Sequence, residues 1–226
     1  MEPIFKRNML EFMMDIRFHN NKEFMNSHRD EYDMKMKKPY YQLIDLLAPS
    51  MLQIDSGMEV RPVKCLSRIF RDTRFSHDKS PYRDHHWVAF RHKGEPREHA
   101  VMYWFEIRLN AVSWGLGFWG ENTKAMDILR RRMVANPNDL LDLLPILDLY
   151  QFSLEGRLYQ RKIVPDELPT PLHLWYPRRD VYLVKKGIQT ETVFETGIEK
   201  RLASDFLALA PFYRLLRGCY ETANQE

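Results

Sequence analysis

The sequence predicts an α+β protein in which an antiparallel sheet meander packs against N-terminal, central and C-terminal helices. Apolar residues recur at helical spacing in the first sixty residues and again after Gly120. The stretch between them is rich in β-branched and aromatic residues and is divided by Gly, Pro and Asn, which is typical of strands. Short turns at residues 93–96 and 109–111 would join these strands as hairpins.

Two helices are expected before the sheet. Asn20 followed by Glu23 resembles a capping box, and apolar residues then recur at helical spacing, so we expect a helix over residues 21–37 that Asn20 caps. Pro39 suits the first turn of a second helix, and Pro49 should kink or end it. Both helices are expected to serve mainly as scaffold.

The predicted strands cover residues 63–71, 87–92, 101–110 and 111–119. Gly115 and Gly117 in the last of them indicate a bulge or a close approach by other atoms, and packing within the protein is the simpler explanation.

The rest of the chain is expected to be mainly helical. In order, we expect a helix from Asn122 or Thr123 through Met133, a helix over 137–147, a proline-rich excursion over 163–179, a short strand over 181–185 and a closing helix over 198–217. Pro211 should kink or divide the closing helix.

Length and composition favour a single α+β domain over residues 1–226, because 44% of the residues are hydrophobic and can fill one sizeable core. No uncharged apolar stretch has the length of a membrane span or a secretory signal, so we expect a soluble, cytoplasmic protein without a membrane partner.

Cys65 and Cys219 lie far apart and indicate neither a disulfide framework nor a zinc site. A net charge of +3 is too small to predict a nucleic-acid partner.

Positive charge is nevertheless concentrated in residues 68–83, here called the basic segment. Its net charge equals that of the whole chain. If the segment begins as a strand, alternate residues share a face, and Asp72 would hold the guanidinium groups of Arg71 and Arg74 ready for a phosphate or carboxylate. The candidate ligand-binding residues are Arg71, Asp72, Arg74, Ser76, Asp78, Lys79 and, beside Gly117, Trp119.

Three runs resemble the family called domain of unknown function 2461. They are residues 20–24 with Arg29 and Tyr32, residues 71–82, and residues 115–119. The middle run is highly specific, and the resemblance covers residues 10–150 well and extends in outline to the proline-rich stretch and closing helix. His77 and Arg83 stand where the family pattern has lysine. The resemblance implies that the basic segment is a signature of the family, but it supplies no catalytic residues.

Other groups of residues give weaker indications of a functional site. Five of the eight histidines lie between residues 77 and 99, but His85 and His86 would point to opposite faces of a strand, so no metal site is expected. Asp72 or Asp78 with Glu106 and Arg108 would be a poor match to a magnesium site, which leaves a Mg-dependent hydrolase as a remote alternative. No nucleophile elbow, Walker loop or dinucleotide fingerprint is present, and no cofactor is indicated.

The sequence therefore favours binding of a small anionic ligand, of which a phosphorylated one is an example, in a cleft lined by the basic segment, with or without turnover. The alternative is a non-enzymatic protein-interaction module that uses the same segment as a docking surface. The two differ in shape, because a pocket should enclose Arg74 and Lys79 whereas a docking surface should leave them exposed.

Overall fold

A five-stranded antiparallel sheet lies at the centre of the protein. The computed structural model describes residues 2–74 and 77–225. The strands are β1 (His86–Arg91), β2 (Val101–Ile107), β3 (Val112–Phe118), β4 (Ser153–Glu155) and β5 (Tyr182–Ile188), in the spatial order β1-β2-β3-β5-β4. Strands β1, β2 and β3 form the predicted meander, and β5 returns to pair with β3. The α+β class is confirmed.

Helices precede and follow the sheet. The α-helices are α1 (Asn8–Phe18), α2 (Lys22–Ser27), α3 (Arg29–Tyr32), α4 (Lys38–Ile54), α5 (Pro62–Cys65), α6 (Thr123–Ala135), α7 (Asn138–Leu141), α8 (Leu144–Tyr150), α9 (Ile198–Ala208) and α10 (Ala210–Gln225). A π-helical turn, η1 (Asp33–Lys37), leads into α4, and 3-10 turns form at η2 (Thr170–Leu172) and η3 (Thr190–Phe194). No helix among these described residues is long and apolar enough to cross a membrane.

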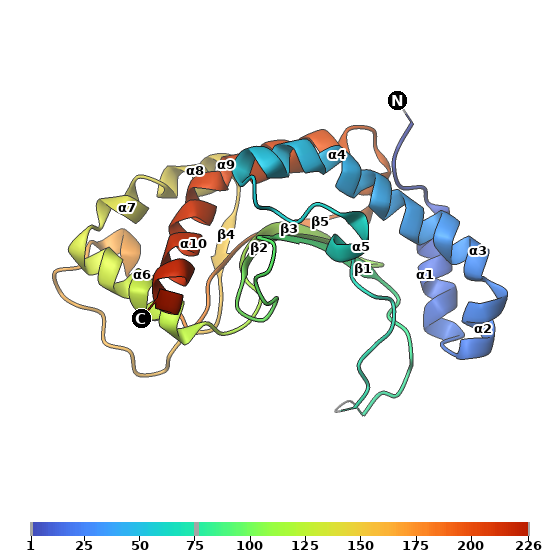
Figure 1. The fold of residues 1–226 in the computed structure, drawn as a ribbon, viewed down its shortest axis with the longest axis horizontal. Coiled ribbons are helices and arrows are strands. Elements are labelled where there is room, and N and C mark those ends of the chain that lie inside the picture. Colours follow the sequence, from blue (N-terminus) through green and yellow to red (C-terminus); the bar gives the residue numbers. More distant parts are fainter. Residues whose placement is uncertain (1, 75–76, 226) are drawn as a thin grey trace.

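The two faces of the sheet have different surroundings. Helices α4, α9 and α10 cover one face, here called the core face (Figure 1). Tyr103, Phe105 and Ile107 of β2 point into it and are completely buried. The alternate residues Trp104 and Glu106 lie on the opposite face and are only half-buried. This second face, here called the open face, therefore remains accessible to a ligand.

The first predicted helix is wrong in its start and its continuity. Residues 21–37 form α2, α3 and η1 in succession rather than one helix. The cap is Asn21, whose side-chain oxygen accepts a hydrogen bond from the Phe24 backbone N–H at 2.9 Å. Asn20 cannot serve as the cap because its side chain bonds a distant segment instead.

The predicted strand over residues 63–71 is also wrong. Pro62 occupies the first turn of the short helix α5, and only isolated bridges follow, at Leu66 with Val88 and at Phe70 with Tyr82. The second bridge lies within the basic segment, which pairs with itself rather than extending the sheet.

Prolines have two different effects in the helices. Pro49 lies inside α4 and does not end it, since the helix continues to Ile54. Near Pro211 the closing helical region is divided, with α9 ending at Ala208 and α10 running from Ala210 to Gln225. The sequence patterns did not indicate α1 or β4.

Close packing between strands explains the two glycines of β3. A Cβ atom on Gly115 would lie 2.0 Å from the Leu183 carbonyl oxygen, and one on Gly117 would lie 2.4 Å from that of Val181. The register of β3 against β5 also shifts between Val112 and Trp114. The glycines are therefore required by the approach of β5, in agreement with the simpler of the two expectations.

Candidate functional site

The basic segment is an irregular hairpin that projects from the sheet on the side opposite α4 and α9 (Figure 1). Its two arms are joined near the base, where Arg71 N–H donates to the Pro81 carbonyl at 2.9 Å and Arg83 N–H donates to that of Ile69 at 2.8 Å. Asn20 fixes the returning arm, because its amide donates to the Tyr82 carbonyl at 2.9 Å and its oxygen accepts from the Tyr82 N–H at 3.0 Å.

The acids of the hairpin divide the arginines between them. Asp72 receives the Arg74 guanidinium at 2.7 Å, whereas Arg71 pairs with Asp78, so the expectation that Asp72 holds both arginines is wrong. The Arg74 side chain holds the pKa of Asp72 down to about 2. The pKa of Asp78 is also lowered, first by hydrogen bonds from Ser80 and then by Arg71.

On either side of residues 75–76, Arg74 and Lys79 are both exposed. The Arg74 side chain is 77% exposed. Lys79 is exposed and donates to the Thr73 carbonyl at 2.9 Å. Ser76, another candidate, lies outside the described residues. The structure therefore does not bring Arg74 and Lys79 into a cleft.

A cleft does form at the base of the hairpin. It has a volume of about 280 Å³ and is here called the arginine pocket. Its lining residues are Arg68, Phe70, Arg71, Asp72, Arg83, Trp87 and Arg97. Two of them, Arg71 and Asp72, were candidates from the sequence. Arg97 comes from the loop between β1 and β2, and no sequence pattern connected it with the basic segment.

Burial and repulsion by neighbouring arginines act on Arg83 and Arg97. Burial lowers the pKa of Arg83, and the nearby positive charges of Arg71 and Arg68 lower it further. Burial likewise lowers the pKa of Arg97, reinforced by Arg91 and Arg68. Arg83 donates to the backbone carbonyls of Arg68 and Phe70 rather than to an acid.

Carboxylates do not balance the arginine pocket. Arg71 pairs with Asp78, but across residues 2–74 and 77–225 no carboxylate forms a salt bridge with Arg68, Arg83 or Arg97. Asp72, the acid in the lining, is already occupied by Arg74. The pocket thus presents an excess of guanidinium groups, of which those of Arg71, Arg83 and Arg97 belong to half-buried residues and that of Arg68 to an exposed one.

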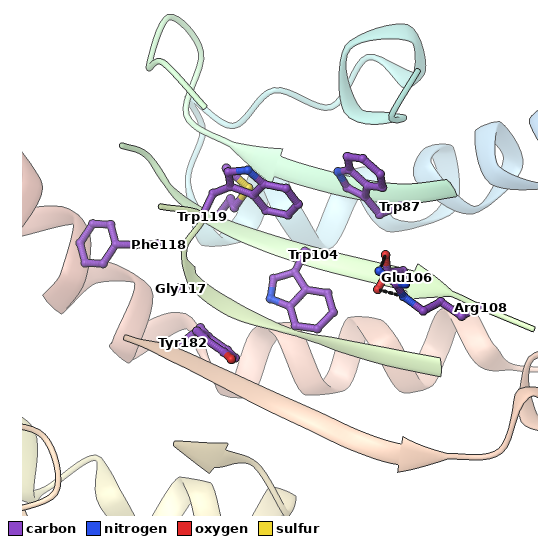
Figure 2. A pocket seen from close by; sticks show the side chains of 9 residues that line it. Trp87, Trp104, Glu106, Arg108, Gly117, Phe118, Trp119 and Tyr182 are labelled. Carbon is purple, nitrogen blue, oxygen red and sulfur yellow. Dashed lines mark hydrogen bonds and ion pairs between the residues drawn. The ribbon is translucent and has the colours of Figure 1, made fainter. Parts of the chain in front are cut away.

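A second hollow of about 250 Å³ lies on the open face and is here called the aromatic hollow (Figure 2). Its lining residues are Trp87, Met102, Trp104, Glu106, Arg108, Gly117, Phe118, Trp119 and Tyr182. Trp87 and Trp119 stack with ring centroids 5.6 Å apart and planes 19° apart. Trp104 pairs across the strands with Gly115, which has no side chain, so its ring is not crowded from β3. Trp119, the aromatic candidate from the sequence, belongs to this hollow.

Paired charges occupy one end of the aromatic hollow. Glu106 accepts from the Arg108 Nε and Nη2 atoms at 2.8 and 2.9 Å, and its carboxylate lies 3.3 Å from His85 Nε2. The other ring nitrogen of His85 lies 2.7 Å from Asp84, which Arg17 also contacts. Burial opposes protonation of His85, but the two carboxylates outweigh it and raise its pKa.

These pairs bear on the hydrolase alternative. Glu106 is bound by Arg108 and His85, and Asp72 and Asp78 each bind an arginine. Among the described residues no group of three or more His, Cys, Asp or Glu side chains is arranged to hold a metal ion. His85 and His86 do lie on opposite faces, since His86 is buried between Tyr32 and Ser67.

The sequence of this chain matches a known protein family. Residues 8–215 match the family described as conserved hypothetical protein, DUF2461. The chain belongs to this family. No curated protein matches the chain. The match spans the whole of the basic segment, the meander and the first part of α10, so the arginine pocket and the aromatic hollow both lie within the matched residues.

Proposed function

We propose that this DUF2461 protein binds a small phosphorylated anion in the arginine pocket. One observation carries the proposal: Arg68, Arg83 and Arg97 converge on one cleft and have no carboxylate partner among the described residues. Half-buried charges of one sign are unfavourable unless a counter-charge neutralises them. A phosphate would supply that charge and accept paired hydrogen bonds from the planar guanidinium groups.

Binding without turnover is the form of the proposal that the lining supports. The described lining of the arginine pocket contains no serine, cysteine or histidine that could act as a nucleophile or base. Its single acid, Asp72, is exposed and bound to Arg74. The residues present can hold and orient an anion.

The test is calorimetric titration of the protein with inorganic phosphate and pyrophosphate. Arg97→Gln and Arg68→Gln each remove a guanidinium for which the structure shows no side-chain hydrogen bond, and each should weaken binding about tenfold or more. Arg161→Gln, at an exposed position outside both hollows, is the matched control and should bind as the unaltered protein does. Failure of both anions to bind, or equal binding by all four proteins, would overturn the proposal.

A second candidate function, docking of a protein partner, rests on the hairpin tip. Arg74 and Lys79 are exposed on a projecting loop, as expected of a docking surface. A charge-reversed Arg74→Glu/Lys79→Glu protein separates the two functions. It should keep its affinity for phosphate if the arginine pocket acts alone, and it should lose any acidic partner that binds the tip. An unchanged partner affinity would remove this candidate.

A further inference from the structure

We infer that the bound anion carries a planar aromatic group, as a nucleoside monophosphate or diphosphate does, with its phosphate in the arginine pocket and its base in the aromatic hollow. This inference rests on the proposed function and adds the class of ligand. It follows from how the two hollows adjoin, which surfaces line the second one, and which charged side chains lie within it.

The two hollows share a wall. Trp87 lines both of them. On the basic side, the Arg83 guanidinium carbon lies 4.9 Å from the centroid of the Trp87 ring. On the aromatic side, Trp119 stacks on the same residue. A ligand that passes a single side chain would therefore contact both the arginines and the tryptophans.

The aromatic hollow has the surfaces that a base requires. Trp119 is 50% exposed, and Trp104 and Tyr182 are half-buried, so ring area of these three residues remains available for stacking, whereas Trp87 is already in contact with Arg83 and Trp119. Figure 2 shows the Trp104 ring in the middle of the hollow, with Trp87 and Trp119 on the β1 side and Tyr182 on the β5 side. The core tryptophans differ, since Trp114 is 0% and Trp175 is 2% exposed.

Flat apolar rings alone would also accept a hydrocarbon, but two polar features favour a base. Glu106, the cross-strand partner of Trp87, and Arg108 line the hollow on the side of Trp87 and offer an acceptor and donors to the edge of a heterocycle. The Trp87 indole N–H is buried and has no hydrogen-bond partner among the described residues. A nucleobase presents both donors and acceptors around an aromatic ring, so it can stack on the tryptophans and also bond to these polar groups.

The volumes of the two hollows favour a ligand larger than phosphate. The arginine pocket, about 280 Å³, has room for a phosphate group, which would leave the adjoining 250 Å³ of the aromatic hollow unused if the ligand were phosphate alone. A phosphorylated sugar would reach past Trp87 but would bring no ring to stack on Trp104 and Trp119. The nucleotide is the ligand class that uses the arginines, the tryptophans and the polar end together.

The experiment compares three probes of increasing size: inorganic phosphate, ribose 5-phosphate and the four common nucleoside monophosphates. Binding is followed by calorimetry and by tryptophan fluorescence. At least one nucleotide should bind about tenfold or more tightly than ribose 5-phosphate, and it should quench the fluorescence, because base–aromatic stacking contributes substantially to affinity. Trp119→Ala should reduce that nucleotide's affinity toward that of ribose 5-phosphate and leave phosphate binding unchanged.

Phe18→Ala is the matched control, because Phe18 is an exposed aromatic residue on α1, outside the hollow, and at 73% is more exposed than Trp119. It should change none of the affinities. Trp104→Leu provides a second variant within the hollow. If phosphate binds but every nucleotide binds no better than ribose 5-phosphate, the inference fails and the proposed function stands. If no phosphorylated probe binds, both fail.

Discussion

The Arg83 guanidinium lies against the Trp87 ring, with 4.9 Å between its central carbon and the ring centroid. This contact joins two parts of the molecule with different chemistry. Arg83 belongs to the basic segment and lines the arginine pocket, whereas Trp87 is on β1 and also lines the aromatic hollow. A cation over an indole ring is a favourable arrangement in a partly buried setting. The pair therefore places a charge of the hairpin directly beside the sheet.

Removal of Arg97 should not destabilise the protein. Burial and the charge of Arg91 both lower the Arg97 pKa, so its charged form is disfavoured where it stands. We expect Arg97→Gln to keep or raise the melting temperature in the absence of anions, measured by differential scanning calorimetry. The same variant should lose most of the stabilisation that phosphate gives the unaltered protein, which at a hundredfold excess over Kd amounts to about 2.7 kcal/mol. A marked fall in melting temperature without anions would contradict this account.

Loss of the Asn20 side chain should loosen the base of the hairpin. Asn20→Ala removes two hydrogen bonds to the Tyr82 backbone, at 2.9 and 3.0 Å, and should cost about 2 kcal/mol of unfolding free energy in urea titrations. Phosphate affinity should fall as well, because the returning arm carries Arg83. The neighbouring Asn21→Ala is the control. It removes only the cap of α2, so it should cost about 1 kcal/mol and leave phosphate affinity unchanged.

Alanine at the β3 glycines should disrupt the sheet. In Gly115→Ala the new methyl group would lie 2.0 Å from the Leu183 carbonyl oxygen, so β5 would have to move. We expect a loss of about 3 kcal/mol or more in unfolding free energy, as for other overpacked sites. Gly218→Ala in the middle of α10 is the contrast, because its nearest neighbour is a flexible Arg132 side-chain atom at 3.5 Å. It should stabilise by about 0.5–1 kcal/mol. Equal losses at the two positions would count against the packing explanation.

Mild acid should destabilise the protein through His86. Burial, together with the charges of His85 and Arg83, lowers the His86 pKa from 6.5 to about 3. Between these two values the unfolded chain binds the proton and the folded protein does not, so stability is fully present above pH 6.5 and falls as the pH is lowered. The expected loss is about 1 kcal/mol between pH 6 and pH 5.

The control for this prediction is His86→Gln, which cannot titrate. Urea unfolding at both pH values should show a smaller difference for the variant than for the unaltered protein. His85 contributes with the opposite sign, because its pKa is raised, and its contribution is lost as the pH rises above 6.5. Measurements below pH 6.5 therefore separate His86 from His85, and the comparison with His86→Gln separates it from carboxyl groups such as Glu59 and Glu106 whose pKa values are also lowered. An equal pH dependence in both proteins would show that His86 is not the titrating group.

Part of the candidate site could be predicted from the sequence. The excess of positive charge in residues 68–83 marked the basic segment, and the position of Trp119 beside Gly117 marked the aromatic surface. The partner of Asp72 could not be predicted, because arginines lie on both sides of it in the sequence. Its ion pair with Arg74 depends on how the chain bends in the folded protein. Asn20 shows the same limit, since a capping pattern cannot reveal a partner 62 residues away.

The sequence by itself determined the α+β class and the β1-β2-β3 meander, because hydrophobic periodicity and turn residues act over neighbouring positions. Only the tertiary structure decided that Arg97 joins Arg68 and Arg83, and that Trp87 stands between the arginine pocket and the aromatic hollow. Those contacts form when β1, β2 and the basic segment come together. Their physical basis is burial and charge in three dimensions, which spacing along the chain does not encode.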